Sequence, residues 1–313
     1  MNLSGLMKRG QLSHWTQAGE IPHGYLKMTS RTWHLIICAL LSFSYSEMAL
    51  PGEQESLQNK SYQQPYSIAL KDITIKGYLA TSDNKSYAST VIIILHGWFS
   101  EDTNGARAYL SYANKLARAG FTSITLSMRG WPDTGGIDDC GHQQSLDMVE
   151  VIEWIKKRSS LKVSNIGIVG FSQGGQVSLL TAAKSRELDF TVAYFPVTDI
   201  NAWQKSSNIK GITDDYIPNT CAQAPGKEIK SPINHVSSIS SPVLFIHGDK
   251  DFRVPTEQSL SMVEKMQQLN KQVELLLIEK ADHGNFSAEQ DQLAFETAVD
   301  FIHRHIESDS SSR

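Results

Sequence analysis

The sequence predicts an α/β fold in which a mostly parallel sheet carries helices on both faces. Short, continuously apolar runs such as 90–95 and 121–126 alternate with longer stretches of helical periodicity. Continuous apolar runs are typical of strands buried on both faces, and their alternation with helices favours a parallel sheet. The chain has 313 residues, of which 40% are hydrophobic and 20% charged, and this suffices for one large core.

The order of the elements can be taken from the same pattern. Residues 67–70 and 73–80 alternate between apolar and polar side chains, which predicts a hairpin at the sheet edge. The later strands are expected at 90–95, 121–126, 166–169, 192–195, 243–247 and 273–278, with helices at 104–119, 146–155, 177–183, 256–269 and 288–306. No internal repeat is visible.

The predicted hydrolytic domain spans 66–306, and four segments differ from it in character. Residues 1–46 resemble a leader in which Met28 is a possible true start, and 47–65 form a polar linker. Residues 199–240 interrupt the strand–helix rhythm, so we expect an insertion that caps the site. The tail at 307–313 is polar and is expected to be disordered.

Within the leader, a basic flank precedes the apolar stretch 33–43, and small residues follow at Ser44 and Ser46. This arrangement is typical of a secretory signal peptide, with a buried or interfacial helix as the alternative. The stretch is shorter than the roughly 20 apolar residues of a membrane span. We therefore expect an exported protein, periplasmic or secreted, with no stable membrane span once the leader is removed.

Export changes the interpretation of the cysteines. Cleavage near Ser46 leaves only Cys140 and Cys221, an even pair that favours one disulfide in an oxidising compartment, with two free thiols as the alternative. The formal net charge of −4, with both signs interspersed, gives no nucleic-acid footprint.

The most informative stretch is 166–175, Ile-Gly-Ile-Val-Gly-Phe-Ser-Gln-Gly-Gly. An apolar strand that turns at Gly-x-Ser-x-Gly into a helix is typical of the nucleophile elbow of α/β-hydrolases, with Ser172 as the nucleophile. A Cβ at Gly170 or Gly174 would collide across the tight turn, and the following helix directs its N–H groups at the site.

In α/β-hydrolases the catalytic acid follows the serine in the chain, and the catalytic histidine follows the acid. His283 follows the last predicted strand and is the expected base. Three aspartates compete for the acid. Asp251 lies deepest in its loop and is preferred, Asp249 is the second choice because it directly follows a turn glycine, and Asp282 adjoins His283 too closely. The two oxyanion donors are expected from the N–H groups of Gln173 and Trp98, although Trp98 could instead be a core or lid aromatic.

Several motifs together resemble the catalytic domain of the prolyl oligopeptidase family. They are Gly-Phe-Ser-Gln-Gly-Gly, Phe-Pro-Val-Thr-Asp at 195–199, Ser-Pro-Ile-Asn at 231–234 and His-Gly-Asp-Lys-Asp-Phe-Arg-Val-Pro at 247–255. The resemblance covers about 66–306 and implies the triad Ser172, Asp251 and His283. Two features depart from the family: fewer than fifty residues separate the expected cleavage site from the first central strand, where the family carries a large β-propeller, and the usual His-Gly-Gly is His96-Gly97-Trp98 here.

These observations predict a serine hydrolase that cleaves carboxylic esters through an acyl-enzyme. The alternative substrate is a short peptide or an acyl-aminoacyl compound, and a third possibility is a non-catalytic binding protein on a hydrolase fold. The mechanism requires no metal or organic cofactor, and no cluster with metal-ligand spacing is present in the sequence.

Overall fold

The computed structural model describes residues 60–98 and 105–310. The predicted leader at 1–46 and the linker residues up to 59 lie outside the described residues. Eight strands form one sheet, and in spatial order they are β1 (Ser61–Ala69), β2 (Thr74–Ser82), β4 (Phe121–Leu126), β3 (Tyr87–Leu95), β5 (Asn165–Phe171), β6 (Phe190–Tyr194), β7 (Val243–Gly248) and β8 (Val273–Ile278).

The first two strands are antiparallel to each other, and β2 is antiparallel to β4. All the remaining pairs are parallel. The predicted fold class is therefore confirmed, and the crossovers place β5 in the middle of the sheet. The carboxyl ends of the parallel strands form one edge, where open α/β sheets place their sites.

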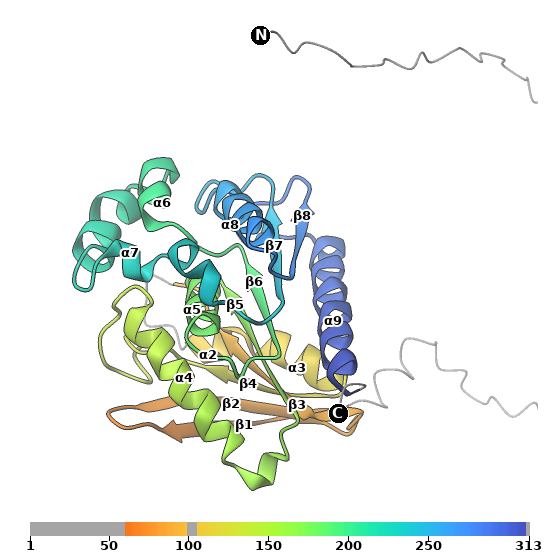
Figure 1. The fold of residues 1–313 in the computed structure, drawn as a ribbon. Helices are drawn as coiled ribbons and strands as arrows, with labels where there is room; N and C mark the ends of the chain where they lie inside the picture. The colour runs from red at the N-terminus through yellow and green to blue at the C-terminus, as the bar shows by residue number, and fades with distance from the viewer. Residues whose placement is uncertain (1–59, 99–104, 311–313) are drawn as a thin grey trace, which may run out of the picture. The chain divides into compact units, whose positions relative to one another are not determined.

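Helices cover both faces of the sheet (Figure 1). One face carries α4 (His142–Lys156), α5 (Gln173–Ala182) and α8 (Glu257–Gln268), and the other carries α3 (Leu110–Arg118) and α9 (Ala288–Ser310). In β3, Ile92 and Ile94 face the α3–α9 side, whereas Ile93 and Leu95 face the α4–α5–α8 side. This explains the unbroken apolar run, since both sides of the strand are buried.

Several elements differ from the sequence prediction, and three of the differences have a clear physical reason or change the element order. Residues 61–65, predicted as linker, belong to β1, whose polar side chains are mostly exposed because the strand lies at the sheet edge and pairs only with β2. The predicted 104–119 helix is divided into α2 (Gly105–Ala108) and α3. Residues 307–310, predicted as disordered tail, continue α9, since neither Gly nor Pro interrupts the helix there.

The 199–240 insertion is largely helical, in contrast to its aperiodic sequence. It contains α6 (Ile200–Ser206), the wide helix η2 (Gly211–Cys221), α7 (Lys227–Lys230) and η3 (Pro232–Ser238). Asp199 caps α6 by accepting the N–H of Ala202 at 3.0 Å. Apolar side chains of α6 and η2 form a separate small core with Val197 and Val254. We call residues 199–240 the cap. In the described part of the chain, no helix has the length and apolar character needed to cross a membrane.

Candidate active site

Ser172 lies on the sharp turn between β5 and α5. Its φ of 52° and ψ of −113° are unfavourable for a residue with a Cβ, and its N–H donates to the Tyr194 carbonyl at 2.9 Å. A Cβ at Gly170 would collide with the backbone of Gly174, and one at Gly174 would collide with the Leu95 and His96 carbonyls. Both glycines are therefore required for β5, α5 and the end of β3 to approach this closely.

The structure brings Ser172, His283 and Asp251 into one hydrogen-bonded chain. Nε2 of His283 lies 3.0 Å from the Ser172 Oγ, and Nδ1 lies 2.6 Å from Oδ2 of Asp251. The two loops that carry Asp251 and His283 follow β7 and β8, at the same sheet edge as the elbow. This is the geometry in which an imidazole can remove a serine proton while a carboxylate fixes its tautomer.

The Asp251 carboxylate is buried and surrounded by donors. Its Oδ1 accepts the N–H groups of Arg253 at 2.9 Å and Val254 at 2.8 Å, and its Oδ2 lies 3.2 Å from Nε2 of His247. Burial alone would raise the pKa of Asp251, but the hydrogen bonds from His247, His283 and the backbone outweigh it and lower the pKa to about 2. The carboxylate is thus ionised at neutral pH.

The two other aspartates occupy different positions. Asp249 accepts the Lys280 N–H at 2.6 Å, and so joins the loops after β7 and β8. Asp282 accepts the N–H of His283 at 2.7 Å and contacts its backbone rather than the imidazole. Among the three candidates, Asp251 alone is described in contact with the His283 ring.

The expected oxyanion donors lie on either side of Ser172. Gln173 is the first residue of α5, so its N–H is not used in the repeating hydrogen bonds of the helix. On the other side, a Cβ at Gly97 would lie 3.4 Å from the Ser172 Cβ, which places the backbone before Trp98 against the nucleophile. The Trp98 side chain is 39% exposed, so it is not a core residue, and its ring lies 5.5 Å from that of Tyr216 in the cap.

Two buried histidines that the sequence analysis did not assign hold these loops. His96 accepts the Met128 N–H at Nε2 (3.0 Å), which leaves Nδ1 to donate to the Gly97 carbonyl (2.8 Å). Burial lowers the pKa of His96 to about 4, so the ring is neutral. His247 has two acceptors near Nε2, the Val254 carbonyl and Asp251, and therefore donates there. Both belong to the quoted motifs, but only the fold reveals their partners.

Two cavities meet at Ser172, and both are also lined by Trp98 and Arg253. The first, of about 370 Å³, is lined by His283 and by side chains of α3 and α9. The second, of about 410 Å³, is lined by Gln173 and by cap residues such as Trp203. We call them the histidine-side cavity and the cap-side cavity.

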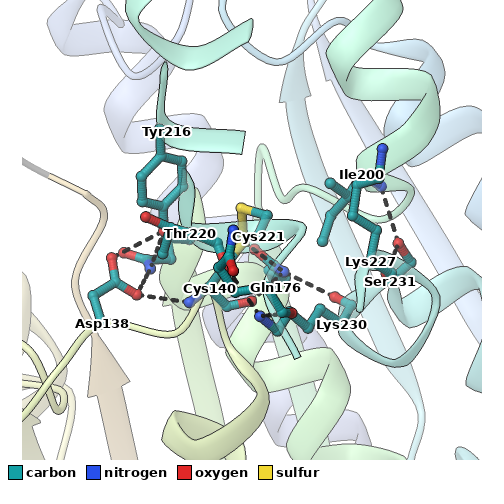
Figure 2. The surroundings of a disulfide bond; sticks show 12 residues. Asp138, Cys140, Gln176, Ile200, Tyr216, Thr220, Cys221, Lys227, Lys230 and Ser231 are labelled. Carbon is teal, nitrogen blue, oxygen red and sulfur yellow. Dashed lines mark hydrogen bonds between the residues drawn. A yellow bond between two sulfur atoms is a disulfide. The ribbon is translucent and has the colours of Figure 1, made fainter. Parts of the chain in front are cut away.

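The cap is bound covalently to the loop before α4. Cys140 and Cys221 form a disulfide with a Cα–Cα distance of 5.0 Å across 81 residues, so the predicted bond is present (Figure 2). Buried Lys230 donates from Nζ to the carbonyls of Thr220 (3.1 Å) and Gln223 (3.0 Å), beside the end of η2.

A polar network joins the same parts. Asp138 accepts the Tyr216 hydroxyl at its Oδ2 (2.9 Å), and the Gln173 side-chain amide and the Cys140 N–H at its Oδ1 (2.9 and 2.8 Å). Burial raises the pKa of Asp138, against these hydrogen bonds. One carboxyl group thus connects the cap, the disulfide and the residue after the nucleophile. The sequence analysis did not predict this network, because its members are far apart in the chain.

Within the described residues, no three His, Cys, Asp or Glu side chains gather closely enough to hold a metal ion. The features of the site described so far are the hydrogen-bonded chain, the two loops beside Ser172 and the two cavities.

Comparisons with known proteins agree with this architecture. The model of the prolyl oligopeptidase family matches residues 109–309, which confirms the resemblance seen in the motifs. The acylamino-acid-releasing enzyme of Mus musculus is 24% identical over 276 residues, 82% of this chain and 36% of the mouse protein. The chain thus spans about a third of the length of the acylamino-acid-releasing enzymes that it matches.

Two solved structures illustrate the fold. The acylaminoacyl peptidase of Pyrococcus horikoshii has a TM-score of 0.66 and 16% identity, covering 81% of this chain and 43% of that one. The esterase Pf2001 of Pyrococcus furiosus has a TM-score of 0.63 and 20% identity, covering 82% of this chain and 96% of that one. Both likenesses show the α/β-hydrolase fold.

Proposed function

Because the chain belongs to the prolyl oligopeptidase family, we propose that it is a serine hydrolase whose nucleophile is Ser172, with carboxylic esters as its favoured substrates. The observation that carries the proposal is the continuous hydrogen-bonded chain from Ser172 through His283 to the ionised Asp251. A serine hydroxyl becomes a strong nucleophile when such a base removes its proton.

The proposed reaction has two halves. His283 takes the proton of Ser172 as the Oγ attacks the substrate carbonyl, and the N–H groups of Gln173 and Trp98 stabilise the oxyanion. His283 then protonates the leaving group, and the acyl-enzyme forms. Water attacks the acyl-enzyme in the same manner and releases the acid. Asp251 keeps Nδ1 of His283 protonated and stabilises the imidazolium, with no change in its own protonation.

Esters are favoured over amides for a chemical reason. An alkoxide is a weaker base, and therefore a better leaving group, than the amide anion of an amine, so a triad that cleaves an amide also cleaves the matching ester. The esterase Pf2001 provides a parallel, since its fold is matched over 96% of its length.

The alternative substrates are short peptides and acyl-aminoacyl compounds. The relatives named as acylamino-acid-releasing enzymes support this alternative. Paired assays with p-nitrophenyl esters and aminoacyl anilides on the purified protein would compare the two substrate classes.

The nucleophile is tested by a fluorophosphonate probe. We expect the wild-type protein to be labelled, and Ser172→Ala to abolish labelling and to reduce kcat by about 10⁴-fold or more while the protein stays folded. Labelling that persists in Ser172→Ala would contradict the assignment of the nucleophile. A folded wild-type protein that is neither labelled nor active would instead support a binding protein on a hydrolase fold.

We also propose that the protein is exported to an oxidising compartment. The Cys140–Cys221 pairing supports this, since disulfides persist mainly in such compartments. Fractionation of the producing cells, followed by intact mass after thiol blocking, tests the proposal. Protein that remains in the cytoplasm with two blocked cysteines would contradict it.

A further inference from the structure

The two cavities at Ser172 are lined by different residues of the catalytic site. His283 lines the histidine-side cavity and Gln173 lines the cap-side cavity. In the proposed mechanism, the atom that leaves must lie within reach of Nε2 of His283, because it receives its proton there. The leaving group therefore extends into the histidine-side cavity, and the acyl group is left to the cap-side cavity.

The histidine-side cavity has an aromatic lining that comes from separate elements. The rings belong to α3, to the ends of β5 and β6, to the loop after β8 and to α9, and include Tyr112, Phe171, Tyr194, Phe195, Phe286 and Phe295. They already contact one another: Tyr112 lies 5.6 Å from Phe295 edge-on, and Phe195 lies 6.0 Å from Phe286 at 90°. Aromatic rings prefer such edge-on neighbours at these distances.

A cation lies at the same cavity. Nζ of Lys115 lies 5.6 Å from the centre of the Phe295 ring, and within the described residues no carboxylate lies within ion-pair distance of it. A cation is attracted to the face of an aromatic ring but not to a saturated ring of the same size.

We propose that the histidine-side cavity is a binding site for an aromatic ring in the leaving group of the substrate. This inference rests on the proposed function, since it assigns the cavity through the proton that His283 delivers. The substrates are then esters of arylalkyl alcohols, in which the ring is separated from the ester oxygen by a short alkyl chain.

The test uses two esters that differ only in the ring. In 2-phenylethyl acetate and 2-cyclohexylethyl acetate the acyl group is the same and the alcohols are of similar basicity. The cyclohexyl ester is the more hydrophobic, so a merely apolar cavity would favour it. We expect kcat/KM to be about 5- to 10-fold higher for the phenyl ester, in line with one or two added ring contacts.

Variants locate the preference. Phe295→Leu and Phe286→Leu should bring the phenyl-to-cyclohexyl ratio towards 1 while fluorophosphonate labelling is retained, which shows that the site is still formed. Ile212→Ala, in the cap-side cavity, is the matched control. It should keep the ring preference but change the ratio of acetate to butyrate esters. A wild-type ratio of 1 or below would overturn the inference, as would a ring preference that only Ile212→Ala removes.

Binding of the product separates this inference from the proposed function. On Ser172→Ala protein, 2-phenylethanol should bind more tightly than 2-cyclohexylethanol in an NMR titration, and Phe295→Leu in that background should remove the difference. If the phenyl alcohol binds more tightly but the wild-type protein hydrolyses no ester, the proposed function fails and the ring site remains. If the two alcohols bind equally, the ring site is refuted even in an active esterase.

Discussion

Asp251 is the residue with the most specific surroundings in the site. It accepts two backbone N–H groups and contacts two imidazoles, and these interactions keep its pKa at about 2 despite its burial. Its neighbour Asp249 lies 31% exposed at the side chain and contacts the Lys280 backbone instead. Two aspartates only two residues apart thus have different environments.

Substitution of the two aspartates should therefore have different effects on kcat. Asp251→Asn keeps the side-chain shape but allows the wrong His283 tautomer, so we expect kcat to fall by about 10⁴-fold. Asp249→Asn can still accept the Lys280 N–H and should reduce kcat far less. Steady-state kinetics on both variants, with circular dichroism to check folding, measures the contrast. The reverse order of effects would identify Asp249 as the acid.

At the scale of single residues, the sequence predicts the catalytic residues but not the residues that hold their loops in place. Chain order and motif spacing predicted Ser172, His283 and Asp251 as candidates that meet. The roles of His96 and His247 could not be predicted, because a histidine that follows an apolar strand has the same sequence signature whether it faces a loop or solvent. His96 accepts a hydrogen bond from a residue 32 positions away in the chain, and His247 donates one to a carbonyl 7 positions away.

Among the elements, the cap is joined to the body of the domain by the disulfide and by several hydrogen bonds, including that of Trp203 with the Arg253 carbonyl. The disulfide joins η2 to the loop before α4, and the Asp138–Tyr216 hydrogen bond joins the same two segments (Figure 2). Because Trp203, Ile212 and Tyr216 line the cap-side cavity, movement of the cap should first weaken binding of the acyl group.

Breaking the disulfide should weaken substrate binding under conditions in which the core of the domain is still folded. Closing a loop of about 80 residues stabilises a protein by roughly 4 kcal/mol through the unfolded state, so we expect reduction to lower Tm. It should also raise KM more than it lowers kcat, because local opening of the cap requires less free energy than unfolding the sheet. Thermal unfolding and ester kinetics with and without reductant measure both effects.

Tyr216→Phe provides the matched control for this prediction, since it removes the hydrogen bonds of the Tyr216 hydroxyl with Asp138 and Gln173 and leaves the disulfide. We expect it to raise KM in the same direction with a smaller change in Tm. A loss of kcat at unchanged KM on reduction would indicate that the disulfide acts on the nucleophile elbow instead of the cap.

For the whole molecule, the sequence predicted the sheet better than the cap. The buried strands are specified by their own apolar runs, and β4 and β8 occupy the residues predicted for them. The cap helices are short, and they are stabilised by packing of α6 and η2 against each other and against the disulfide. Their sequences therefore show little of the apolar periodicity that predicts a helix. The predicted strand at 67–70 was shorter than β1 for a different reason. A strand at the edge of a sheet needs no apolar face, so its polar residues give no strand signal.

The buried His96 should make the stability of the whole domain depend on pH. Its folded pKa of about 4 lies below the value of 6.5 for an unperturbed histidine, so between these values the unfolded chain binds a proton that the folded one does not. Stability should therefore fall as pH falls through this window, by up to about 3 kcal/mol from this group.

Urea unfolding at pH 7 and pH 4 measures this dependence. In His96→Gln, which retains a donor and an acceptor but cannot titrate in this range, the loss of unfolding free energy between the two pH values should be smaller than in the wild type. Equal losses in the two proteins would show that His96 does not control the acid sensitivity.

The disulfide has one more consequence, which concerns the continuity of the chain. Cys140 and Cys221 close a covalent ring that contains β5, α5, β6 and most of the cap, whereas Asp251 and His283 lie outside it. A protease that cuts the exposed peptide at Gly211 therefore opens the ring without releasing a fragment. The nucleophile and its base stay in one covalent molecule, and the two pieces separate only after reduction.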